Sequence, residues 1–121
     1  MRKIMTPLLL AAALTTPALA QSYPVSGKWG ESTSSQQGPI DCSGRRVMQF
    51  EGNQRTDSDG GVPTYRNLSV TSAGSSRYRV VDTFANALQS NPHTEYTLTQ
   101  VDQDHIVLDT QGGPIRLQRC R

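Results

Sequence analysis

The stretch TEYTLTQVDQDHIVLDTQGGPIRLQRC, residues 94–120, decides the fold class of this chain. It holds three runs in which apolar and polar side chains alternate: residues 94–101, 105–109 and 115–120. Asp102-Gln103-Asp104 separates the first two runs, and Gln111-Gly112-Gly113-Pro114 separates the last two. Both separators are rich in turn-forming residues. Alternation with a period of two is typical of strands with one buried face, so the stretch predicts three antiparallel strands joined by hairpins.

The same pattern continues toward the N-terminus. Further strands are expected at residues 25–32, 45–51, 65–70 and 77–84, with a weak strand and a wide turn inside the polar run 54–63. Residues 72–76 predict a hairpin loop, and residues 85–91 predict one helical turn closed by Pro92. Short strands at even spacing indicate an all-β, antiparallel meander. Its most economical closure is a small barrel, which leaves no exposed sheet edges.

Residues 1–20 have the three-part layout of a secretory signal peptide. A basic start, Met1-Arg2-Lys3, is followed by an apolar run at residues 8–14 and by the small-x-small cleavage site Ala18-Leu19-Ala20. The segment is too short for a permanent membrane anchor, and Gln21 offers no thiol for lipid attachment. We therefore expect one mature domain over residues 21–121, periplasmic or secreted and without a membrane anchor.

The charge balance of the mature domain argues against a nucleic-acid or membrane-surface partner. The whole chain has 12 Lys and Arg against 10 Asp and Glu, but Arg2 and Lys3 leave with the signal peptide. Ten basic and ten acidic residues remain, so the expected net charge is zero. A neutral domain lacks the basic footprint that binds phosphates.

Two cysteines, Cys42 and Cys120, remain in a compartment that favours oxidation. An even count there predicts one disulfide, whereas a metal-binding or redox pair would require a C-x-x-C spacing that is absent. Closing so long a loop contributes roughly 4.5 kcal/mol in the chain-entropy treatment. That is a large share of the stability of a small domain with few large apolar residues.

Catalytic and metal-binding constellations are missing from the sequence. No G-x-S-x-G elbow is present, and His93 and His105 have neither a triad context nor metal-ligand spacing, so both are expected to be solvated surface residues. The segment Asp57-x-Asp59-Gly60 resembles the start of a calcium loop but lacks the later ligands. We expect no enzymatic activity, no cofactor and no metal.

Asp82 is the polar residue of most interest. If residues 77–84 form a regular strand, its carboxylate points the same way as Tyr78 and Val80. A buried carboxylate must be paired or hydrogen-bonded. Two interpretations remain open: a structural ion pair at the barrel mouth, with Arg66 or Arg116 among the candidate partners, or a ligand-binding group.

Ser26-Gly27-Lys28-Trp29-Gly30 resembles the G-x-W signature that opens the first strand of lipocalins and related calycin barrels. The resemblance implies a calycin-like barrel in which Trp29 closes one end and an arginine of the last strand packs over the indole. Arg119 is the first candidate for that arginine and Arg116 the second. In that family these residues are structural, so the signature implies a fold and not an activity.

Two groups of small periplasmic inhibitors resemble this chain in size and export signal. Inhibitors of secreted metalloproteases also open with G-x-W, and their N-terminal arm enters the protease cleft; the arm here, residues 21–25, is very short. Residues 72–78 resemble a Ser/Gly-rich loop of periplasmic lysozyme inhibitors, and they equally fit an ordinary hairpin turn. The leading hypothesis is a monomeric, non-catalytic module that binds another envelope or secreted protein. One form of this hypothesis is an enzyme inhibitor. The alternative is a carrier of a small apolar or amphipathic ligand.

Overall fold

The computed structural model describes residues 22–86, 88 and 90–121 of the chain. Eight strands follow one another in this part: β1 (Gly27–Glu31), β2 (Val47–Glu51), β3 (Gln54–Asp57), β4 (Thr64–Gly74), β5 (Arg77–Thr83), β6 (His93–Asp102), β7 (His105–Thr110) and β8 (Gly113–Arg119). No helix among the described residues is long and apolar enough to cross a membrane. The signal peptide expected at residues 1–20 lies outside the described residues.

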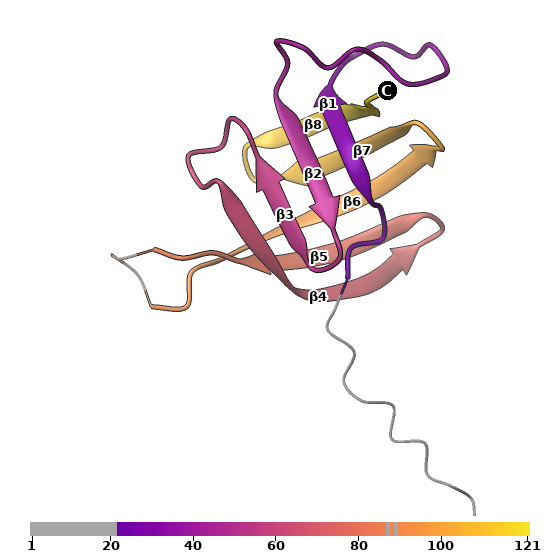
Figure 1. Cartoon of the computed structure of the whole chain (residues 1–121). Helices are drawn as coiled ribbons and strands as arrows, with labels where there is room; N and C mark the ends of the chain where they lie inside the picture. Colours follow the sequence, from indigo (N-terminus) through magenta and orange to yellow (C-terminus); the bar gives the residue numbers. More distant parts are fainter. Residues whose placement is uncertain (1–21, 87, 89) are drawn as a thin grey trace, which may run out of the picture.

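Each strand pairs antiparallel with the next along the chain, and β8 pairs back onto β1, so the sheet closes into a barrel. Figure 1 shows β1, β2 and β3 on the near side, β6 to β8 behind them, and β4 with β5 along the lower edge. The closing register places Trp29 opposite Arg119 and Glu31 opposite Leu117. The prediction of an all-β antiparallel meander closed into a small barrel is confirmed.

Strand β4 differs most from its expected length. It continues to Gly74, so the connection to β5 is only Ser75-Ser76, with Ser76 in the left-handed region at φ 56°. The pairing of β4 with β5 is irregular between Asn67 and Ser69 and again between Ser72 and Gly74. Such bulges bend and twist a hairpin, which sequence alternation does not reveal. The helical turn expected at residues 85–91 includes residues 87 and 89, which lie outside the described residues.

The inward faces of the strands form the core. Its apolar members are Trp29, Met48, Phe50, Val80, Tyr96, Leu98, Ile106, Leu108 and Leu117. The segment before β1 adds Tyr23 and Val25, which are also buried. The Tyr23 ring packs edge-on against Phe50, with the ring centroids 5.1 Å apart, and its amide donates to the Gly52 carbonyl at 3.0 Å. The N-terminal segment is therefore part of the packed domain.

The long loop between β1 and β2 is held at several points. Cys42 and Cys120 form the predicted disulfide, which ties this loop to the end of β8. Buried Gln118 accepts from the Ser32 hydroxyl and donates its amide hydrogens to the carbonyls of Gln36 and Gly38, at 2.8–3.0 Å. In Figure 1 this loop and the C-terminus lie at the same end of the barrel.

Candidate functional site

Trp29 and Arg119 meet at one end of the barrel. Trp29 is completely buried, and the Arg119 guanidinium carbon lies 4.4 Å from the centroid of its ring. The indole nitrogen donates to the Ser26 carbonyl at 3.1 Å. Gly27 adopts φ +92°, a conformation that side-chain-bearing residues rarely take. The packing that the G-x-W resemblance implies is thus present, with Arg119 as the arginine over the indole.

Asp82 lies at the centre of a buried polar network. One carboxylate oxygen accepts from Arg55 Nε and from the Tyr96 hydroxyl, both at 3.0 Å, and the other accepts from Asn67 Nδ2 at 3.2 Å. Asp82 is fully buried and Arg55 is only 5% exposed. Asp82 forms an ion pair, and its partner is Arg55. The expectation of Arg66 or Arg116 as the partner was wrong, because both lie on the exposed side of their strands while Arg55 points inward.

Arg55 is fixed in place by aromatic rings as well as by Asp82. Its guanidinium carbon lies 3.9 Å from the centroid of the Tyr65 ring and 5.1 Å from that of Tyr96. Burial opposes the charged form of Arg55, yet Tyr96 and Asp82 together raise its pKa above the ordinary value. Burial also raises the pKa of Tyr96 and of Tyr23, and the negative charge of Asp82 acts in the same direction on both. Both phenols therefore stay neutral beside the ion pair.

A small pocket of about 170 Å³ opens beside this network. Arg55, Tyr65 and Tyr96 line it, together with a second ion pair between Arg46 and Asp57. Arg46 donates to Asp57 through Nε at 3.0 Å and through Nη2 at 2.8 Å. We call this space the mouth pocket. Met48, Leu108 and Ile115 supply its apolar wall.

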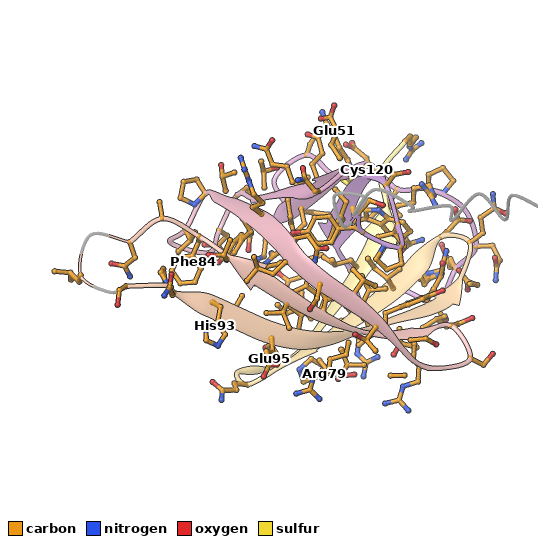
Figure 2. All side chains as sticks on the ribbon, turned by 90° about the horizontal axis from the view of Figure 1, so that it is seen from below. Glu51, Arg79, Phe84, His93, Glu95 and Cys120 are labelled. Carbon is orange, nitrogen blue, oxygen red and sulfur yellow. A yellow bond between two sulfur atoms is a disulfide. The ribbon has the colours of Figure 1, made fainter. Side chains whose placement is uncertain are left out.

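Other hollows lie elsewhere on the described part of the protein. One of about 900 Å³ is bounded by Lys28, Gln49 and Thr56 and by both cysteines of the disulfide. A second borders Arg79, His93 and Glu95, where Arg79 and Glu95 form an exposed ion pair at 3.3 Å. Figure 2 shows these three labelled residues on one side of the barrel and Glu51 with Cys120 on the other. An exposed pair of this kind contributes little free energy.

The two histidines have different environments. His93 is exposed, as expected. The expectation for His105 was wrong, because its side chain is only 13% exposed and both ring nitrogens face acceptors. Nδ1 lies 2.8 Å from Asp102 Oδ1 and Nε2 lies 3.1 Å from the Ser34 carbonyl. His105 therefore tethers the β1–β2 loop. Among residues 22–86, 88 and 90–121 no group of three or more His, Cys, Asp or Glu side chains is placed to hold a metal ion.

Strand β4 has one side without a partner. Its pairing with β3 extends only from Thr64 to Arg66, and Asn67 then donates its amide to the Asn53 carbonyl at 2.8 Å. Over residues 68–74 the described part of the chain supplies neither a strand partner nor a backbone hydrogen bond on the side away from β5. We call this side the open β4 edge. Leu68, at its start, is 51% exposed.

Comparisons with known proteins add no identity to this geometry. No family model, no curated protein and no solved structure matches the chain. The class that the structure itself defines is a closed, eight-stranded, antiparallel β-barrel with one disulfide.

Proposed function

We propose that this chain is an exported, non-catalytic module that binds another protein by pairing with one of its extended segments along the open β4 edge. Unpaired amides and carbonyls on a sheet edge are a template for a strand of another chain. The open β4 edge is the observation that carries the proposal, because it is longer than the other one-sided stretches of the described strands, residues 93–96 of β6 and 113–115 of β8.

The edge lacks two of the features with which natural sheets prevent such pairing, charged side chains and proline. Its bulges lie between Asn67 and Ser69 and between Ser72 and Gly74, so residues 69–72 are the regular stretch that a partner strand can follow. Residues 67–76 contain no charged residue and no proline, and side chains from Thr71 to Ser76 are exposed. The exposed Leu68 adds an apolar contact next to the backbone donors and acceptors. The edge is therefore suited to an extended, uncharged segment of a partner.

The interior of the barrel supports a protein-binding module over a carrier. The core residues fill it, and the mouth pocket of about 170 Å³ is smaller than the roughly 300 Å³ at which cavities for drug-sized ligands begin, so it has no room for the larger ligand that a lipocalin-like carrier encloses. The arm-in-cleft mode of the metalloprotease inhibitors receives no support either. Tyr23 and Val25, which would belong to such an arm, are packed in the core.

Export belongs to the same proposal, and it rests on residues 1–20 and on the disulfide between Cys42 and Cys120. A disulfide is typical of an oxidising compartment. N-terminal sequencing of the exported protein should begin at Gln21. A mature protein that retains Met1 contradicts the export proposal and leaves the proposal for the open β4 edge unaffected.

Affinity capture with the mature protein as bait tests the binding function. Leu68→Lys combined with Thr71→Lys places two charges on the open β4 edge and should abolish capture of a partner that the wild type retains. Val101→Lys is the matched control, because Val101 is a 61% exposed apolar residue on β6, and β5 lies between β6 and β4. In the complex, hydrogen exchange should slow at the backbone amides of residues 68–74. A partner that binds the double variant as well as the wild type contradicts the proposal.

The same edge could also pair with a second copy of the chain, and light scattering distinguishes this outcome. We expect a monomer without the partner. If the wild type is a dimer and the Leu68→Lys, Thr71→Lys variant is a monomer, the open β4 edge serves self-association, and the proposal that it binds another protein is contradicted.

A further inference from the structure

The mouth pocket contains hydrogen-bond donors that the protein itself does not use. Arg55 directs Nε to Asp82, and its Nη1 contacts only the Met48 sulfur at 3.8 Å. Arg46 directs Nε and Nη2 to Asp57. Within the described residues, Nη2 of Arg55 and Nη1 of Arg46 have no hydrogen-bond partner, and both side chains line the pocket.

The acceptors nearby are already occupied. Asp57 Oδ1 accepts from Arg46 and from the Asp59 amide, while its Oδ2 accepts from Arg46. Both oxygens of Asp82 are likewise engaged, by Arg55, Tyr96 and Asn67. The pocket therefore contains hydrogen-bond donors without a partner, while the carboxylate oxygens beside them already accept hydrogen bonds. A ligand that accepts hydrogen bonds would complement it.

We infer that the mouth pocket binds a small carboxylate with a compact apolar body. A carboxylate is the acceptor that matches a guanidinium best, because charge-assisted hydrogen bonds are roughly twice as strong as neutral ones. Met48, Leu108 and Ile115 provide the surface for the apolar body. This site is separate from the open β4 edge and does not depend on the proposed protein partner.

The geometry of Arg55 favours binding for a further reason. The guanidinium is held between the rings of Tyr65 and Tyr96 and anchored by Asp82, so the donors are in place before a ligand arrives. Preorganisation of this kind lowers the entropic cost of association. The size of the pocket limits the ligand: a cavity of about 170 Å³ lies well below the roughly 300–1,000 Å³ of sites for drug-sized ligands, which excludes a long acyl chain.

Titration of the disulfide-bonded protein with benzoate, followed by backbone and side-chain NMR shifts, tests the inference. Benzamide is the matched probe, because it keeps the shape and the carbonyl but lacks the charge. Saturable shifts should occur at Tyr65, Leu108 and Thr110 with benzoate, and benzamide should bind about tenfold more weakly. Equal binding of the two probes overturns the carboxylate assignment, and an absence of saturable shifts with benzoate overturns the site.

Three variants show where the probe binds. Ile115→Phe fills the apolar part of the pocket and should abolish the shifts. Arg46→Lys keeps a cation beside Asp57 but removes the free Nη1, and it should weaken benzoate about tenfold. Arg79→Lys, on the outer face, should leave the affinity unchanged. If Ile115→Phe does not fold, Arg46→Lys decides alone, and benzoate binding that Arg46→Lys leaves unchanged overturns the proposal.

Discussion

Arg119 and Trp29 are direct cross-strand partners in β8 and β1, and the guanidinium of the first lies over the ring of the second. The same guanidinium donates to the Gln103 carbonyl at 3.0–3.3 Å and lies 3.6 Å from Asp104 Oδ1. Arg119 therefore connects the closing strands of the barrel to the turn between β6 and β7. One side chain stabilises a ring, a strand pair and a turn.

Truncation of this pair tests its contribution to stability. Arg119→Ala should lower the free energy of unfolding by about 0.5–2 kcal/mol, as expected for loss of a cation–π contact. Trp29→Ala should cost about 3–5 kcal/mol because it leaves a large cavity. Arg116→Ala is the control, since Arg116 is an exposed arginine of the same strand. Urea unfolding in which Arg116→Ala costs as much as Arg119→Ala would contradict the role of the stacked arginine.

The disulfide should account for much of the stability of the domain. Cys42 and Cys120 are 78 positions apart, and the chain-entropy treatment gives roughly 4.5 kcal/mol for a loop of this length. The Cys42→Ser, Cys120→Ser double variant should therefore melt far below the oxidised wild type. Reduced wild type is the control and should behave like the double variant. Equal melting of oxidised and reduced wild type would refute the prediction.

The disulfide leaves no room for a side chain at Gly30. A Cβ at this position would overlap Cys42 Sγ and crowd Cys42 Cβ at 3.3 Å. Gly30→Ala should thus destabilise the oxidised protein by about 1–3 kcal/mol, as overpacking typically does. The same substitution in the Cys42→Ser, Cys120→Ser background should cost less. Equal costs of Gly30→Ala in both backgrounds, measured by urea unfolding, would show that the strain lies elsewhere.

The fold was predictable because it follows from local sequence patterns: alternating apolar and polar residues, and turn-forming residues between them. The alternation at residues 94–120 and the turn residues between the runs specify hairpins one at a time, and β6, β7 and β8 match the expectation closely. The two cysteines specify their own pairing because they are the only two. What escaped prediction was β4, since its bulges at residues 67–69 and 72–74 break the alternation on which strand prediction depends.

The buried network was only half predictable. Asp82 stood out because it interrupts the apolar face of its own strand, but Arg55 lies in the polar run at residues 54–63, where no apolar pattern indicates which face is buried. Its position follows from the register of β3, which places Arg55 between Phe50 on β2 and Tyr65 on β4. A partner fixed by register across three strands leaves no signal in local sequence.

Removal of one member of the Arg55–Asp82 pair should be more damaging than removal of both. Asp82→Leu leaves a buried guanidinium without its carboxylate, and such a loss typically costs about 3–5 kcal/mol. Arg55→Met combined with Asp82→Leu replaces the pair by apolar groups and should recover part of that stability. Denaturant unfolding of the two single variants and the double variant measures the coupling energy. Additive losses would mean that the two charges do not stabilise each other.

Asp57 should control part of the stability of the protein in acid. Burial alone would raise the pKa of Asp57, but hydrogen bonds from Arg46 and from the Asp59 amide outweigh it and lower the pKa below its ordinary value of 3.8. The folded state therefore binds a proton less readily than the unfolded state. The Asp57 carboxylate stabilises the fold at pH values above its pKa in the unfolded state, and this contribution is lost as the pH falls through its pKa in the folded state.

Asp57→Asn should cost about 1.5–3 kcal/mol near neutral pH, the value of hydrogen bonds to charged groups. The difference between variant and wild type should shrink below pH 3.8. Asp109→Asn, on an exposed residue of β7, is the control and should leave the free energy of unfolding near neutral pH within about 0.5 kcal/mol of the wild type. A stability gap between Asp57→Asn and wild type that stays constant from neutral pH into acid would show that the fold does not depend on the charge of Asp57.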